Sequence, residues 1–151
     1  KLIASMSQSF PIGAILTIKV NNNSSFTFKP RLLEGVKLKD EPIPDSLILD
    51  GQQRLTSAYM CLRSGSAVSI RDRQTHKVQE RWYYIDIPAA LNPEIERVDA
   101  IISLPRSQTQ KTKHRKIDCT TAEKEYEQLL FPVCAIFNYV QWREGFQKYW
   151  N

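Results

Sequence analysis

The hydrophobic period of this chain changes abruptly within residues 48–57, which read ILDGQQRLTS. The short apolar run over 46–49 has the length of a buried strand. Beyond Gly51, apolar residues recur at helical spacing, and Gly65 supplies a stop signal just after the last turn. The pattern therefore predicts a buried strand, a tight glycine turn and a helix that begins at Gln52.

Upstream of this switch, the pattern is typical of a helix end followed by a β-hairpin. Phe10-Pro11 closes the helix, because the residue before a proline is pushed out of the α region. Aliphatic and alternating runs on either side of an asparagine-serine cluster then indicate two strands joined by a turn. The expected elements are the last turns of a helix over 1–9, a buried strand from 14 to 20, a turn over 21–25, a strand over 26–32 and a loop over 33–45.

The rest of the chain alternates between further strands and helices. A second hairpin is expected, and Pro88 closes it. Thr120 or Thr121 is placed to cap a helix whose first turn carries Glu123 and Glu125, and acidic residues are favourable there. The expected elements are paired strands over 67–73 and 77–87, a short strand over 100–105, a mobile basic stretch over 107–116, a helix over 122–131 and one or two helices over 133–150.

The composition is that of one soluble domain with an excess of positive charge. The 151 residues carry a net charge of +5 and a pI near 9.2, which favours polyanionic partners such as nucleotides or nucleic acid. No apolar stretch approaches the roughly 20 residues needed to cross a bilayer, so no membrane partner is expected. Cys61, Cys119 and Cys134 are widely spaced and form no zinc motif, which fits free thiols in the cytoplasm.

The polar residues at the switch form a candidate anion site. A helix N-terminus gathers unpaired backbone N–H groups and the positive end of the helix dipole. Gly51 lets a phosphate approach the backbone, and Arg54 can bind the phosphate through two N–H groups. The amides of Gln52 and Gln53 can donate to phosphate oxygens, while Asp50 can hold Mg²⁺ or orient a water. The alternative is that Asp50 caps the helix, Gly51 makes the turn and the other residues are solvated.

Two motifs together resemble a known family. DGQQR at residues 50–54, followed by Leu55-Thr56, combines with FPIG at residues 10–13 leading into a strand. This combination resembles the DGQQR-motif N-terminal domain of GmrSD-type modification-dependent restriction enzymes (DUF262-like), in the ParB/sulfiredoxin-like superfamily. The resemblance implies an α+β fold with a small mixed sheet flanked by helices and with helical C-terminal elements.

The extent of the resemblance sets the expected domain organisation. The match is good over residues 1–87 and loose over 89–151. We expect a ParB/sulfiredoxin-like DGQQR domain over 1–118 and a helical extension over 119–151 that packs on it. The chain begins without Met, so a fragment of a longer protein is expected.

The resemblance also implies a role for each residue of the two motifs. Gly51, Arg54 and Thr56 would bind the phosphates of a nucleoside triphosphate. Asp50 would be needed for hydrolysis and would hold the Mg²⁺ that accompanies the nucleotide. The remaining site residues are Gln52 and Gln53 on the catalytic side, and Phe10, Pro11, Ile12 and Gly13 on the opposite wall.

The expected function is therefore to bind and hydrolyse a nucleoside triphosphate in a DNA restriction or phage-defence protein, as a Mg²⁺-dependent NTPase that regulates a nuclease. His76 and His114 lie far apart, so the nuclease is expected in another domain or a partner, and DNA is expected to bind the full-length protein. Two alternatives remain open. One is a DNA-binding or DNA-nicking module that holds a backbone phosphate in the same pocket. The other is a non-catalytic interaction domain that retains the fold.

Two further groups of residues have an ordinary explanation beside a functional one. The aromatic residues at 82–84 could stack on a base, although core packing explains at least one face of their strand. The basic run could contact DNA phosphates or belong to a solvated loop. Its candidate nucleic-acid contacts are Lys111, Lys113, Arg115 and Lys116.

Overall fold

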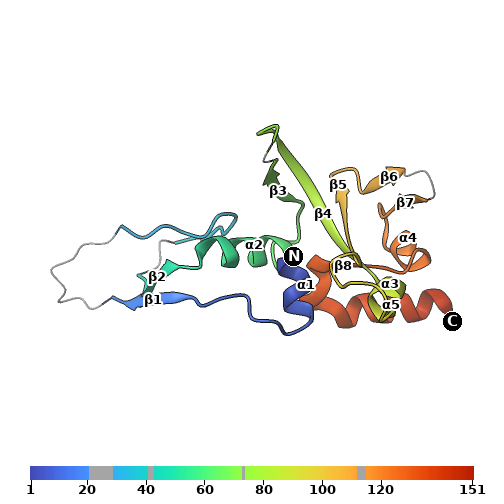
Figure 1. The fold of residues 1–151 in the computed structure, drawn as a ribbon, viewed down its shortest axis with the longest axis horizontal. Coiled ribbons are helices and arrows are strands. Elements are labelled where there is room, and N and C mark those ends of the chain that lie inside the picture. Colours follow the sequence, from blue (N-terminus) through green and yellow to red (C-terminus); the bar gives the residue numbers. More distant parts are fainter. Residues whose placement is uncertain (21–28, 41–42, 73, 112–114) are drawn as a thin grey trace.

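A computed structural model of the chain describes residues 1–20, 29–40, 43–72, 74–111 and 115–151. Within these ranges the chain has an α+β architecture in which helices flank small sheets (Figure 1), so the expected class is confirmed. The helices are α1 (Leu2–Ser7), α2 (Gln52–Leu62), α3 (Ile87–Leu91), α4 (Ala122–Glu127), the 3-10 helix η1 (Val133–Asn138) and α5 (Tyr139–Trp150). The strands are β1 (Leu16–Lys19), β2 (Ser46–Asp50), β3 (Val68–Arg71), β4 (Val78–Asp86), β5 (Ile101–Pro105), β6 (Thr109–Lys111), β7 (Lys116–Asp118) and β8 (Leu130–Pro132).

The main sheet is built around the long strand β4. Its first half pairs with β3, and its second half pairs with β5 and β8, which confirms the second hairpin and the strand expected over 100–105. The core lies against this sheet and contains Tyr84, Leu104, Ile117, Cys119 and Leu130. All strand pairs within the described ranges are antiparallel, whereas the resemblance implied a mixed sheet.

The strands β1 and β2 form a separate two-stranded ribbon at one end of the molecule (Figure 1). Where the structure describes the predicted hairpin, its second strand is missing: β1 pairs with β2, and residues 29–32 have no regular structure. The expected turn over 21–25 and the strand positions 26–28 lie outside the described residues. The expected burial of β2 is also wrong, since the side chain of Leu49 is 49% exposed. In a two-stranded ribbon, β2 is paired only with β1 and has no third strand on its other edge.

The helix α2 begins at Gln52, as expected, and joins the ribbon to the rest of the molecule. It packs against η1, where the guanidinium of Arg63 lies 5.3 Å from the ring centre of Phe137. The helix end expected at the start of the chain is confirmed as α1, which contacts α2. Among the residues that the structure describes, no helix has both the length and the apolar character to cross a membrane.

The C-terminal third departs from its expected pattern in two places. Thr121 caps α4 as expected, but the helix ends at Glu127 and the following residues form β8. Leu129, two residues beyond the end of α4, has a positive φ of 55°, which a right-handed helix does not accommodate. The basic stretch expected to be mobile contains β6 and the first residue of its partner β7, although residues 112–114 lie outside the described ranges.

A buried carboxyl group connects α5 to the main sheet. The indole Nε1 of Trp142 donates to Glu125 Oε2 at 3.1 Å, and the hydroxyl of Tyr84 also bonds to Glu125. Gln108 Nε2 in turn donates to that hydroxyl at 2.8 Å. Burial raises the pKa of Glu125 to about 7, against the lowering effect of the Trp142 and Tyr84 hydrogen bonds.

We expect Glu125 to make the protein less stable as the pH rises. The pKa of its carboxyl is raised from 4.5 to about 7 in the folded protein, so the folded state retains a proton that the unfolded chain loses. The free energy of unfolding should fall between about pH 5 and about pH 8, by about 3 kcal/mol in total. Urea titrations across this range measure the decline.

The matched variant is Glu125→Gln, which keeps the size and hydrogen-bonding capacity of the side chain but does not titrate. Its unfolding free energy should change far less over the same pH range. Asp118 does not interfere, because the hydrogen bond from Lys124 lowers the pKa of that carboxyl to about 2 and moves its titration to more acidic conditions. Parallel curves for the wild type and Glu125→Gln would contradict this account of Glu125.

Candidate functional site

The side chain of Arg54 joins the two sequence motifs. Arg54 lies in the first turn of α2, and its Nη2 donates to the carbonyl of Ala14 at 2.6 Å. Its Nη1 donates to the carbonyl of Ile12 at 3.4 Å. Nη2 also lies 3.3 Å from Asp50 Oδ2. The guanidinium thereby connects residues 12–14 to residues 50–54, and we call these two segments together the Arg54 corner.

Two glycines make room for this guanidinium. Gly13 has a φ of +97° and Gly51 a φ of +91°, in the region that L side chains rarely adopt. A Cβ at Gly13 would overlap Nη1 of Arg54. A Cβ at Gly51 would lie 3.3 Å from Nη2 of Arg54 and 3.2 Å from Cγ1 of Ile15. Each glycine is therefore required both for its backbone conformation and for the close approach of its neighbours.

The start of α2 adds backbone donors to the corner. Gly51 is the N-cap, no side chain caps the helix, and its first turn contains no acidic residue. The interpretation of Asp50 as the cap is therefore wrong. The N–H groups of the first turn have no intrahelical partner, and the helical bonds begin with Leu55 N to Gly51 O at 3.0 Å. Uncapped N–H groups beside a guanidinium suit an anion.

The two glutamines of the motif have different surroundings. Gln52 Nε2 donates back to the carbonyl of Ile48 at 2.9 Å, so its amide supports the end of β2. Gln53 is exposed to solvent. Only Gln53 therefore has an amide that can reach a ligand without breaking the bond to β2.

The residues that flank the corner lie less close to Arg54. The ring of Phe10 is largely exposed, and the Phe10 N–H donates to the carbonyl of Ser5, which ties this residue to α1. Pro11 is also exposed, and Thr56 is half-buried within α2. The structure thus brings Ile12 and Gly13 to Arg54 through their backbone.

Asp50 supplies the carboxylate of the corner, and its side chain is 76% exposed. Magnesium ions that accompany nucleotides commonly use one or two protein carboxylates together with phosphate oxygens and waters. Within the ranges that the structure describes, no group of three His, Cys, Asp or Glu side chains could hold a metal ion. Asp50 is thus a single exposed carboxylate, which could serve only as one ligand among several that a metal ion needs.

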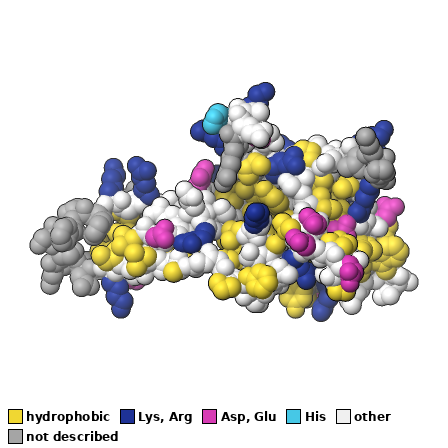
Figure 2. All heavy atoms as spheres, in the orientation of Figure 1, with side chains coloured by type: hydrophobic (Ala, Val, Ile, Leu, Met, Phe, Trp, Pro, Cys, Tyr) yellow, Lys and Arg dark blue, Asp and Glu magenta, His cyan; other side chains and the backbone are white. Residues whose placement is uncertain are grey.

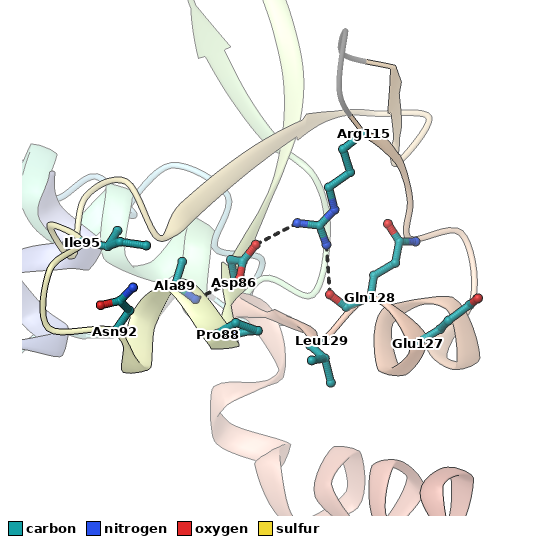
Figure 3. Close-up of a pocket in the computed structure, with 9 residues that line it drawn as sticks. All are labelled: Asp86, Pro88, Ala89, Asn92, Ile95, Arg115, Glu127, Gln128 and Leu129. Atoms are coloured by element: carbon teal, nitrogen blue, oxygen red, sulfur yellow. Dashed lines mark hydrogen bonds and ion pairs between the residues drawn. The ribbon is translucent and has the colours of Figure 1, made fainter.

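A cavity of about 600 Å³ lies elsewhere, between α3, α4 and the start of β7 (Figure 3). Arg115 points across it, where Nη1 lies 2.9 Å from Asp86 Oδ2 and Nη2 donates to the carbonyl of Gln128 at 3.0 Å. The other oxygen of Asp86 accepts the Ala89 N–H at 3.1 Å. These bonds hold three elements together. The lining residues are Asp86, Pro88, Ala89, Asn92, Ile95, Arg115, Glu127, Gln128 and Leu129.

The candidate nucleic-acid contacts fall into different surroundings. Lys111 and Lys116 are exposed at the ends of β6 and β7. Arg115 is engaged with Asp86, and Lys113 lies outside the described residues. The structure therefore leaves Lys111 and Lys116 as the solvent-facing cations of this run within the described ranges.

Sequence reasoning missed Ala14, which belongs to the corner, and Ile15, which lies beside it. Ala14 contributes only its carbonyl, and Ile15 lies against Gly51. The available signal was their position directly after Gly13. Residues that follow a glycine close to Arg54 in sequence order are also expected to lie near Arg54 and Gly51.

Comparison with known proteins identifies one family. The family model of the GmrSD restriction endonuclease N-terminal domain matches residues 1–145. No curated protein and no solved structure matches the chain.

We expect Gly13→Ala to destabilise the protein through Arg54. The new Cβ would displace the guanidinium and would strain a positive-φ backbone, at a cost of about 2 kcal/mol in the free energy of unfolding. Gly65→Ala is the comparison, because Gly65 also has positive φ but a Cβ there would meet no atom within 4 Å. Denaturant titration of both variants, and of Gly13→Ala in an Arg54→Ala background, measures the two contributions.

The double substitution separates strain from displacement. If Gly13→Ala acts through Arg54, its cost should shrink in the Arg54→Ala background toward that of Gly65→Ala. An unchanged cost in that background would show that the close approach of Arg54 to Gly13 does not contribute to stability.

Proposed function

Since the chain belongs to the family of GmrSD restriction endonuclease N-terminal domains, and so is a domain of a restriction and phage-defence protein, we propose that its Arg54 corner binds a nucleoside triphosphate with Mg²⁺. Hydrolysis of this nucleotide regulates a nuclease that lies in another domain or a partner. The same proposal places the chain among ParB/sulfiredoxin-like domains, in which the glycine and arginine of the motif bind nucleotide phosphates. Here those residues are Gly51 and Arg54.

The observation that carries the proposal is the placement of one guanidinium between a glycine backbone and an uncapped helix start. Three of the five N–H groups of Arg54 are used by Ile12, Ala14 and Asp50. Among the described residues, two N–H groups of Arg54 remain for phosphate oxygens, near the uncapped first turn of α2. A triphosphate carries several negative charges, which this concentration of donors stabilises.

The ion pair between Asp50 and Arg54 provides a way for the nucleotide to enter. At 3.3 Å, and with 76% of the Asp50 side chain exposed, this pair is a weak surface contact. Asp50 can turn toward a Mg²⁺ ion that accompanies the phosphates, and this frees one further N–H of Arg54 for a phosphate oxygen. The exchange costs little because both charges keep an opposite charge nearby.

Hydrolysis would follow from the same arrangement. A water attacks the γ-phosphorus, the bond to the β–γ bridging oxygen breaks, and the products are a nucleoside diphosphate and inorganic phosphate. Mg²⁺ held by Asp50 and the phosphates would neutralise the charge that develops on the phosphate oxygens. Arg54 would stabilise the same charge, and the amide of Gln53, which is exposed to solvent, would orient the water.

We expect isothermal titration calorimetry to show saturable binding of at least one of the four nucleoside triphosphates in the presence of Mg²⁺. Arg54→Gln should weaken that binding by about tenfold to about a hundredfold, because it removes charge-assisted hydrogen bonds to phosphate. Arg63→Gln is the matched control. It removes the same charge just beyond the other end of α2, where Arg63 stacks on Phe137, and should leave the affinity unchanged.

Phosphate release distinguishes binding from hydrolysis. Asp50→Asn should slow release of inorganic phosphate while the variant still binds the nucleotide. If the wild-type chain binds none of the four nucleotides, or if Arg54→Gln and Arg63→Gln bind alike, the Arg54 corner is not a nucleotide site.

A further inference from the structure

The C-terminal helix α5 lies on the surface and is attached through aromatic rings. None of its residues, all of which the structure describes, is buried. The rings of Trp142 and Phe146 pack against Tyr126 of α4, at 5.1 Å and 5.9 Å between ring centres, and Trp142 also contacts Phe131 of β8. Gly145 permits this approach, because a Cβ there would overlap the hydroxyl of Tyr126. Figure 1 shows α5 along the lower edge, and Figure 2 shows hydrophobic side chains at the surface of this end of the molecule.

A single hydrogen bond accompanies these ring contacts. Within the described ranges, the bond from Trp142 Nε1 to Glu125 Oε2, at 3.1 Å, is the only one that joins α5 to another element. No ion pair in those ranges involves α5, whose charged side chains are all exposed: Arg143, Glu144 and Lys148. Glu125 is therefore the group through which charge can act on the docking of α5.

The surroundings of Glu125 supply hydrogen-bond donors but no positive charge among the described residues. Tyr84 of β4 bonds to its carboxyl group, and Glu123 of α4 adds a second negative charge nearby. The neighbouring cation Lys124 is bonded to Asp118 instead. When Glu125 ionises in the docked protein, it is thus a buried negative charge without a cation, which is costly.

The other titratable groups around Glu125 do not change charge with it. They lie on β4, α4 and η1 and directly after β7. Burial raises the pKa of each of these groups above its ordinary value, so they stay protonated and neutral where Glu125 titrates. These groups are the phenols of Tyr84 and Tyr126 and the thiols of Cys119 and Cys134.

We propose that Glu125 and Trp142 form a pH-dependent switch that releases α5 from α4 and β8 when the carboxyl group ionises. Release brings water to the charge and uncovers the rings of Tyr126 and Phe131. The opening is local, because α5 contributes no buried residue to the core around β4. The switch shares no residue with the Arg54 corner and does not depend on nucleotide binding there.

The direction of the switch follows from the two states of Glu125. Burial, opposed by the Trp142 and Tyr84 hydrogen bonds, raises the pKa of this carboxyl to about 7 in the docked state, and solvation after release moves it back toward 4.5. A raised pKa favours the docked state at low pH, and that contribution is lost as the pH rises through the raised value. Docking is therefore tightest below about pH 5 and weakest above about pH 7.

Native-state hydrogen exchange of the 151-residue chain, followed by NMR, tests the proposal. After correction for the intrinsic exchange rate, the amides of α5 should lose protection by about tenfold to about a hundredfold between about pH 5 and about pH 8. At each pH they should exchange faster than the amides of β4. Low concentrations of urea should accelerate exchange in β4 but hardly in α5, because local opening exposes little surface.

Three variants identify the group responsible. Glu125→Gln keeps an acceptor for the Trp142 indole but cannot ionise, so its α5 protection should not change with pH. Glu127→Gln is the matched control: it removes the same charge from an exposed position on the same helix and should keep the wild-type pH dependence. Trp142→Phe keeps an aromatic ring but removes a donor to the carboxylate, so the midpoint of the pH dependence should move to higher pH.

The proposal is overturned if α5 and β4 exchange at the same rate and respond equally to urea, since the opening would then be global. It is also overturned if the protection of α5 does not change with pH, or if Glu125→Gln keeps the wild-type pH dependence. Each of these results concerns α5 alone and leaves the Arg54 corner to its own test.

Discussion

The contact on which the candidate site depends is the pair of hydrogen bonds from Arg54 to the carbonyls of Ile12 and Ala14. These bonds join segments about forty positions apart in sequence, and they hold the chain that leads into β1 against the start of α2. Gly13 lies between these two residues in the chain and has a positive φ. Because it has no side chain, the guanidinium of Arg54 can pack directly against its backbone. A side chain at Gly13 would break the contact, and without it the two motifs would have no polar connection within the described residues.

The hydrogen bonds of Arg54 are important for the β1–β2 end of the molecule, because that end has few buried apolar residues and the main sheet has many. The buried apolar residues of the described chain lie within residues 68–133, apart from Ala4. The β1–β2 ribbon has no such core, and Leu16 and Leu49 are both about half exposed. Elements with few buried contacts open at low free-energy cost, and functional segments are commonly of this kind. A site at the base of such a ribbon can rearrange around a ligand while the main sheet stays intact.

Much of the fold followed from hydrophobic period and turn chemistry, because these signals are local. The start of α2 at Gln52, the β3–β4 hairpin and the Thr121 cap all have causes within a few residues. The partner of β1 could not be predicted in the same way. Alternation over 26–32 indicates a strand, yet nothing local specifies that β1 pairs with β2 instead. The early end of α4 was hidden for a similar reason, since no local signal gives Leu129 a positive φ.

The site itself was partly predictable. The motif residues Asp50, Gly51 and Arg54 were recognised, and the structure brings Ile12 and Gly13 of the FPIG segment to Arg54. The direction of each hydrogen bond was not predictable, because it depends on tertiary contacts: Arg54 uses backbone carbonyls, and Gln52 turns back to Ile48. The buried Glu125 also escaped notice, because an acidic residue in a first helical turn is ordinarily exposed, and its burial here depends on tertiary contacts with Trp142 and Tyr84.

The most direct measurement is a proton–nitrogen NMR titration of the chain with a nucleoside triphosphate and Mg²⁺. Saturable shifts should centre on the backbone amides of Gly13, Gly51 and Gln53 and on the side-chain Nε–H of Arg54. Amides around the cavity of Asp86 and Arg115 should not move. Shifts that centre on that cavity, or a corner that does not respond to any of the four nucleotides, would contradict the assignment of the Arg54 corner as the nucleotide site.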